Sequence, residues 1–535
     1  MEHRRPNILV IMTDEERYPP SYEDAALRRF RGEQLPGQQA LRARACEFHR
    51  HHAASSACAP SRASLFTGHY PTLHGVRATD GAAKSAQDPN MFWLEPNTVP
   101  TLGHYFRAAG YRTHYRGKWH VSHADLVTPD NRTSIASSDD EGAPIATNTE
   151  LYRTAERLAL HGFLGWVGPD PHGAARSNCG KLRDPIFADQ VEQLFDGLER
   201  SADVSPWLTV ASFVNPHDIV LFGALWAAWG YAFDDDTVPE IPEPPTQDES
   251  LRHKPSCQAD YVKKYGKVFV PQPQIPVYRR FYYYLHKLVD LQVARVLQRL
   301  AASRFAENTI VVYTSDHGEM LGAHGGMHQK WHNAYDETLR VPLLIAGPGI
   351  TPGSRVDQLS SHVDLLPTLL ALAGLDAEAL RGELARGHSE AQALVGRDLS
   401  ALARGEAGPD EPVYFMTEDE VSEGLQQTNI LGFKYEAVEE PAKVEAVIAR
   451  VDLGTGVRLW KYARAYRRSL IGDPADASRW PERCEYELYD LDADPLETEN
   501  LAHGIGDRDT RAAREHMAAL LDETRAKKAL HPRLR

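Results

Sequence analysis

Three stretches of the chain are almost continuously apolar and rich in β-branched residues: Asn7–Thr13, Trp207–Val214 and Thr309–Thr314. Runs of this length and composition are typical of strands in a parallel sheet that is covered on both faces. The pattern therefore predicts buried, mostly parallel strands that lie far apart in the sequence.

Segments between these runs repeat apolar residues at helical spacing. The predicted helices are Thr101–Ala109, Pro276–Leu300 and Asp364–Leu372, and Gly110 and Gly374 follow two of them as C-terminal caps. Alternation of strands and helices predicts an α/β fold, with a doubly wound sheet flanked by helices.

Each apolar run ends at a residue that can carry chemistry. Asp14 follows the first run, His217 the second and Asp316 the third. Because ligands of open α/β sheets bind at the carboxyl ends of the strands, we expect these three side chains to converge.

Two long stretches, residues 122–198 and 221–274, are rich in Pro, Gly, Asp and Ser. This composition predicts loops or lids inserted into a catalytic domain that spans residues 1–404. Residues 405–412 are typical of a linker. Beyond it, the predicted elements of a smaller α+β domain at 413–535 are strands at Val413–Thr417, Gly432–Ala437 and Tyr486–Leu491 and a helix at Asp507–Lys528.

Composition narrows the class of protein. At 535 residues the chain is too long for one core, which agrees with two domains. The net charge of −15 disfavours nucleic acid and anionic membranes as partners, so local cations and a metal would have to attract an anionic substrate. Five unpatterned cysteines, and an N-terminal apolar run too short for a secretory signal, predict a cytoplasmic protein.

The sequence Cys58-Ala59-Pro60-Ser61-Arg62 carries the most specific signal. Cys58 stands at the expected start of a helix, with Pro60 in its first turn, where free N–H groups and the helix dipole favour an anion. By itself such a cysteine could also be a buried residue before a helix, which is the less favoured alternative. The run C-x-P-S-R, followed by Thr67-Gly68, resembles the sulfatase signature, in which the cysteine is oxidised to formylglycine.

Further landmarks similar to those of the sulfatase family follow in order from Asn7 to about Ala502. They are Asn7–Asp14, Gly110–Thr113, Gly117–His120, Asn215–Asp218, Thr314–Glu319, Arg340–Leu344 and Glu487–Leu491. The resemblance implies an alkaline-phosphatase-like fold and a bacterial enzyme matured by a formylglycine-generating enzyme. We also expect a homo-oligomer.

The resemblance implies one divalent metal ion held by Asp14, Glu15, Asp316, His317 and the formylglycine made from Cys58. Mostly hard oxygen ligands suit Ca²⁺ or Mn²⁺. Sulfatases more often carry Asp-Asp and Asp-Asn at these two pairs. Asp316-His317 is similar to the phosphonate monoester hydrolase branch and favours Mn²⁺, whereas Glu15 could be a ligand or point elsewhere.

Cations near the nucleophile complete the predicted site. Arg62 lies one helical turn after Cys58, and Lys118 and His120 are two apart, which on a strand places both on one face. The resemblance implies that Arg62 holds formylglycine, that Lys118 contacts the sulfuryl oxygens and that His120 acts as a base.

Two further residues would serve the leaving group. The resemblance implies that His217 contacts the sulfuryl group and, with Lys330, protonates the leaving oxygen. The spacing from Lys330 to Arg340 is one residue off the usual register, so His328 or His332 could take the place of Lys330.

These residues predict hydrolysis of aryl or small alkyl sulfate monoesters through a formylglycine nucleophile and a covalent sulfoenzyme intermediate. One alternative keeps the site and changes the substrate to phosphonate monoesters or phosphodiesters. Another is an anion-binding protein without catalysis, in which Cys58 stays a thiol.

Overall fold

The computed structural model describes residues 5–81, 83–171, 175–221, 230–231, 233, 235–269, 275–425, 427–429, 431–452, 456–467, 469–471 and 484–533. A seven-stranded mixed sheet forms the larger part, with the order β3-β4-β1-β5-β6-β2-β7. Its strands are β1 (Asn7–Asp14), β2 (Ala45–His52), β3 (Arg112–Gly117), β4 (Trp207–Pro216), β5 (Thr309–Ser315), β6 (Leu343–Ala346) and β7 (Arg355–Ser361).

The three strands predicted from their apolar runs are central and adjacent. β1 lies between β4 and β5 and pairs with both in parallel, while β6 runs antiparallel to β5 and β2. The strand direction and the flanking helices confirm the α/β prediction, with the carboxyl ends of β1, β4 and β5 at one edge.

Side chains of β1 alternate between two cores, as expected for a strand covered on both faces. Ile8, Val10 and Met12 pack with residues of α3 (Cys58–Thr67), α5 (Leu102–Ala108) and α12 (Leu365–Leu372). Leu9 and Ile11 pack with residues of α7 (Gly180–Arg200) and α9 (Ile275–Ala301). The remaining helices of this part are α1 (Ala25–Gln34), α2 (Pro36–Arg42), α4 (Pro71–His74), α6 (Ala146–Ala155), α8 (Ser256–Val268), α10 (Ala323–Gly326), α11 (Asp336–Leu339), α13 (Ala377–Leu384) and α14 (Ser400–Ala403).

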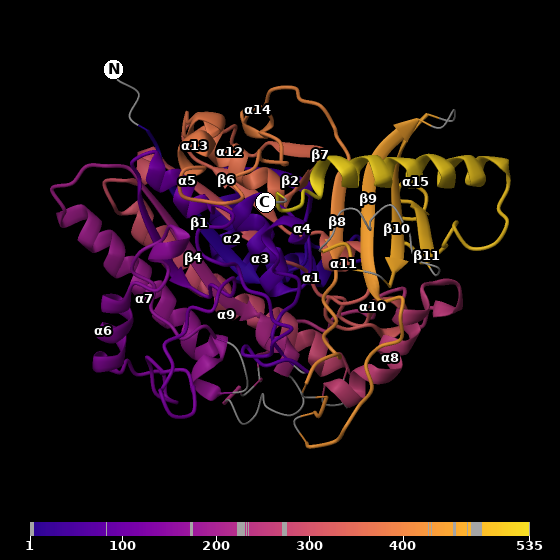
Figure 1. The fold of residues 1–535 in the computed structure, drawn as a ribbon, viewed down its shortest axis with the longest axis horizontal. Helices are drawn as coiled ribbons and strands as arrows, with labels where there is room; N and C mark the ends of the chain where they lie inside the picture. Colours follow the sequence, from indigo (N-terminus) through magenta and orange to yellow (C-terminus); the bar gives the residue numbers. More distant parts are fainter. Residues whose placement is uncertain are drawn as a thin grey trace.

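A second, antiparallel sheet stands beside the first (Figure 1). Its order is β11-β10-β9-β8, with β8 (Val413–Thr417), β9 (Lys443–Asp452), β10 (Val457–Tyr466) and β11 (Cys484–Asp490). α15 (Arg508–Lys528) covers one face, where Met517 and Leu521 pack on strand residues. On the other face, Tyr261 and Tyr265 of α8 pack with β8 and β9.

Several sequence predictions were wrong. The stretch 122–198 is not simply a loop, because it contains α6 and most of α7, whose first turns carry Gly180 and Pro185 and so resemble loop sequence. The stretch 221–274 contains α8, although 222–229 and 270–274 lie outside the described residues. Gly432–Ala437 forms no strand, only a bridge between Thr428 and Lys434.

Strands β9 and β10 were not predicted. Their apolar pattern is broken by Glu445 and Arg464, which pair across the two strands in a buried salt bridge of 2.6 Å. Within the described residues, no helix combines the length and the apolar character that a membrane span requires.

Candidate active site

Cys58 is the first residue of α3 and is only 2% exposed. Its Sγ lies 3.2 Å from His317 Nε2 and 3.7 Å from Asp14 Oδ1. The helix start thus projects the sulfur between the ends of β1 and β5. The predicted convergence of strand ends holds for Asp14 and Asp316, and His217 directly follows β4.

Four donor groups could hold a metal ion here. One donor atom each of Asp14, Cys58, Asp316 and His317 lies within 4.8 Å of the others. His317 Nδ1 lies 3.0 Å from the carbonyl oxygen of Gly318, so Nδ1 donates its proton there and Nε2 presents a lone pair to the cluster. Burial lowers the pKa of His317 to about 4, which keeps the imidazole neutral. Two carboxylates and a neutral imidazole fit a divalent cation.

Glu15 lies beside this cluster rather than within it. It belongs to a second, overlapping group with Asp14 and His217. Its Oε2 accepts a hydrogen bond of 3.0 Å from Lys330 Nζ, while its buried Oε1 has no partner among the described residues. Burial raises the pKa of Glu15, Lys330 opposes the shift, and the neighbouring Glu319 carboxyl adds to it. An unpaired buried oxygen leaves room for Glu15 to serve a cation, and direct ligation stays a prediction.

The Arg62 side chain holds several groups of the site in place through hydrogen bonds. Its Nε donates to Asp316 Oδ2 at 2.7 Å and one terminal nitrogen donates to Asp14 Oδ2 at 2.8 Å. The other terminal nitrogen donates to the Lys118 carbonyl and to Ser212 Oγ. The fork of one guanidinium therefore fixes both carboxylates and the segment that carries Lys118.

Lys118 adds a second cation, with its Nζ 2.7 Å from Asp14 Oδ2. Burial alone would raise the pKa of Asp14, but Lys118, His217 and Arg62 hold it well below its usual range. Burial disfavours the charged form of Lys118, yet Asp14 raises its pKa. The carboxylate and both cations therefore stay charged at neutral pH.

The prediction that Lys118 and His120 share one face of a strand was wrong. β3 ends at Gly117, and both residues lie beyond it. His120 has a φ of 52°, and Asp170 holds this turn by accepting from the backbone N–H groups of Trp119 and His120 at 2.7 and 3.0 Å. His120 Nε2 lies 2.5 Å from Asp80 Oδ1.

Sequence reasoning missed Asp80 and Asp170. Neither belongs to a motif, and each meets residue 120 only because the chain folds back over 40 or 50 residues. A single sequence carries no signal that would have identified them.

His217 and Lys330 both lie near the Glu15 carboxylate. One donor atom of His217 lies within 4.8 Å of those of Asp14 and Glu15, and Lys330 Nζ donates to Glu15 Oε2. The enclosed position and the Lys118 cation hold the pKa of His217 well below its usual range. The alternatives to Lys330 face other partners: Nδ1 of His328 contacts the Gly326 carbonyl and Nδ1 of His332 the Ala442 carbonyl. Lys330 is thus the one of the three that contacts the predicted site.

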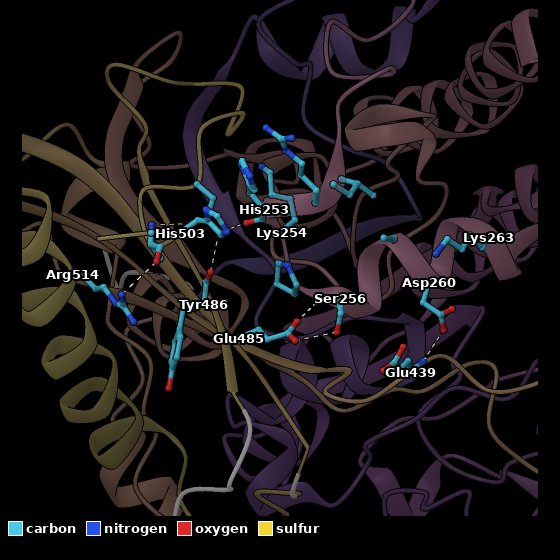
Figure 2. A pocket seen from close by; sticks show the side chains of 17 residues that line it. His253, Lys254, Ser256, Asp260, Lys263, Glu439, Glu485, Tyr486, His503 and Arg514 are labelled. Carbon is cyan, nitrogen blue, oxygen red and sulfur yellow. Dashed lines mark hydrogen bonds between the residues drawn. The ribbon is translucent and has the colours of Figure 1, made fainter. Parts of the chain in front are cut away.

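A separate cleft of about 640 Å³ lies between α8 and β11 (Figure 2). None of the predicted site residues lines it. Several of its charged groups have partners on its own walls, such as Glu485, which accepts from Ser256 Oγ at 3.1 Å. The chemistry of the strand ends therefore does not extend into this cleft.

Comparison with known proteins agrees with this geometry. The profile of the sulfatase family matches residues 6–375. The choline-sulfatase of Rhizobium meliloti is 29% identical over 392 residues, which cover 70% of this chain and 69% of that protein.

Solved structures share the fold over 98% of this chain. A 2-O GAG sulfatase superposes with a TM-score of 0.64 at 23% identity, covering 93% of that chain. The phosphonate monoester hydrolase of Silicibacter pomeroyi superposes with a TM-score of 0.62 at 19% identity, covering 96% of that chain. The chain belongs to the sulfatase family. It is a sulfuric ester hydrolase with the alkaline-phosphatase-like fold.

Proposed function

We propose that Cys58 matures to formylglycine and that the enzyme hydrolyses aryl or small alkyl sulfate monoesters through this residue. The observation that carries the proposal is the position of Cys58 Sγ, at the start of α3 and within a cluster of metal-ligating donors. Burial, followed by the charge of Asp14, raises the pKa of the Cys58 thiol. A thiol that resists ionisation is a poor nucleophile, which favours modification over direct use of the sulfur.

Asp14, Asp316, His317 and the modified residue 58 would hold the divalent cation, with Glu15 as a further candidate. When bound, such an ion acidifies a hydroxyl group and stabilises developing negative charge. Oxygen donors with one imidazole suit Ca²⁺ or Mn²⁺.

The other residues take roles that follow from their contacts. Lys118 and Arg62 are fixed cations beside the nucleophile, positioned to stabilise charge on the sulfuryl oxygens. Lys330, which donates to Glu15 Oε2, holds a proton at Nζ for the leaving oxygen. The resemblance to sulfatases gives His120 the role of the base that accepts the proton lost by the second hydroxyl of hydrated formylglycine when sulfate departs, and the contact with Asp80 would orient its ring.

The first test is the mass of the tryptic peptide that contains Cys58, in protein produced with a formylglycine-generating enzyme. We expect a peptide about 18 Da lighter than the cysteine form, together with turnover of an aryl sulfate. Cys58→Ala should abolish turnover, whereas Cys484→Ser, which changes a half-buried free cysteine in β11, should leave it unchanged. Full turnover with an unmodified thiol would contradict the proposal. A Cys58 that stays an inactive thiol in protein produced with the formylglycine-generating enzyme would favour the anion-binding alternative.

A phosphonate monoester or phosphodiester substrate is the second candidate. The Asp316-His317 pair, with His317 Nε2 3.2 Å from Cys58 Sγ, is the observation that favours it. Turnover of matched aryl sulfate and aryl phosphonate esters decides between the two. Faster cleavage of the phosphonate would replace sulfate as the proposed substrate. The homo-oligomer, the cytoplasmic location and the maturing enzyme remain predictions.

A further inference from the structure

The end of β8 touches the segment that leads to the nucleophile. Met416 N–H donates to the Ala54 carbonyl at 3.1 Å, and Thr417 Oγ1 donates to the Ser56 carbonyl at 2.5 Å. β8 belongs to the second sheet, so residues far along the chain fix the approach to Cys58.

Asp419 follows this strand and is 3% exposed. Its Oδ2 accepts two hydrogen bonds of 3.1 Å, one from the backbone N–H of Thr79 and one from Nε1 of Trp331. Hydrogen bonds to a carboxylate are stronger than neutral ones, and a buried carboxylate has few alternatives to them.

The two segments that Asp419 joins both carry residues of the site. Thr79 precedes Asp80, whose Oδ1 lies 2.5 Å from His120 Nε2. Trp331 follows Lys330, whose Nζ lies 4.9 Å from the centre of the Trp331 ring. One carboxylate of the C-terminal part thus links the loop that orients the base to the loop that carries the proton donor.

We propose that Asp419 is a positioning residue that holds the Asp80 loop and the Lys330 loop in register with Cys58. The proposal rests on the roles given above to His120 and Lys330. It assigns the C-terminal sheet a part in assembling the active site, although Asp419 itself needs no contact with the substrate.

The first experiment compares Asp419→Ala with Asp419→Asn and with Glu418→Ala in the full-length, formylglycine-containing enzyme. Misplacement of groups by about 1 Å costs on the order of 100-fold in rate, so we expect Asp419→Ala to lower kcat by about 10- to 100-fold with little change in KM. Asp419→Asn keeps an acceptor oxygen and should recover most of kcat.

Glu418 is the matched control. It is the preceding buried carboxylate, but its Oε1 accepts from Tyr466 Oη and from the backbone of Leu470, within the C-terminal part. We expect Glu418→Ala to lower stability without lowering kcat of the folded enzyme. Equal kcat in Asp419→Ala and Glu418→Ala, each corrected for folded protein, would overturn the proposal.

Hydrogen–deuterium exchange tests the same role without activity. Asp419→Ala should speed exchange at residues 77–81 and 329–333, whereas Trp331→Phe, which removes the indole N–H together with part of the ring, should speed it at 329–333 alone. Unchanged exchange at both loops in Asp419→Ala would overturn the proposal, even if kcat of this variant falls. A wild-type protein that cleaves no ester would instead refute the proposed function, and the exchange data would still decide the role of Asp419.

Discussion

At the scale of single residues, His324 is a buried histidine between two acids. Its Nδ1 lies 2.9 Å from Glu249 Oε2 and its Nε2 lies 3.7 Å from Glu337 Oε2. The ring stacks on Tyr335 at 3.7 Å between centroids. Burial alone would lower the pKa of His324 and nearby Lys254 acts in the same direction, but the two carboxylates raise it to about 9. The imidazolium therefore forms on folding.

This shift predicts a pH-dependent loss of stability. Because the pKa of His324 rises from 6.5 to about 9 on folding, its contribution is complete below pH 6.5 and disappears as the pH rises through about 9. The linkage is worth about 3 kcal/mol at most. We expect the free energy of unfolding in urea to fall more between pH 6.5 and 9.5 in the wild type than in His324→Gln. Parallel pH profiles for the two proteins would contradict the assignment.

At the scale of elements, the sequence revealed strands better than the turns that follow them. The near-continuous apolar runs of β1, β4 and β5 identified the three central strands, because those strands are buried on both faces. The end of β3 could not be read in this way. Its geometry depends on Asp170, which reaches the turn at His120 from 50 residues away.

Gly117 makes that turn possible, and two glycines that bracket β3 test it. Gly117 has a φ of 105°, and a Cβ there would lie 1.8 Å from the carbonyl oxygen of Ser212. Gly110 has a φ of 83° but nothing within 4 Å of such a Cβ. Gly110→Ala should cost only backbone strain, about 1–2 kcal/mol.

Gly117→Ala should lower the free energy of unfolding by more than Gly110→Ala does, because the β4 backbone must move to make room for the methyl group. The same movement should displace Lys118. We expect kcat to fall by about 100-fold in Gly117→Ala and to stay near wild type in Gly110→Ala. Thermal unfolding and steady-state kinetics measure both effects. Similar stability and kcat in the two variants would show that β4 accommodates the methyl group.

At the scale of the whole molecule, buried charges join the two sheets. Lys461 of β10 lies 2.7 Å from Asp336 Oδ1 and 2.8 Å from Glu497 Oε1, and its side chain is 1% exposed. Asp336 begins α11, which leads to β6 of the larger sheet. These buried charges also explain why the strands of the C-terminal sheet were not predicted from the sequence. Buried charged residues such as Lys461 and Glu445 interrupt the alternation that would have marked β9 and β10.

Substitution of Lys461 tests most directly whether these ion pairs hold the two sheets together. Lys461→Met keeps the length of the side chain but leaves the buried Glu497 without its cation, which typically costs about 3–5 kcal/mol. Asp336 is partly exposed and keeps Arg340 at 3.8 Å. Burial raises the pKa of Glu497 to about 7 although Lys461 opposes the shift, so removal of Lys461 raises this pKa further and lets Glu497 reduce the penalty by taking up a proton. The loss of stability should therefore be larger at pH 9 than at pH 7. The control is Lys527→Met, which breaks an exposed pair with Glu523 on α15 and should change stability little. Chemical unfolding followed by tryptophan fluorescence measures both variants. If Lys461→Met unfolds at the same denaturant concentration as Lys527→Met, apolar packing and not this ion cluster holds the two sheets together.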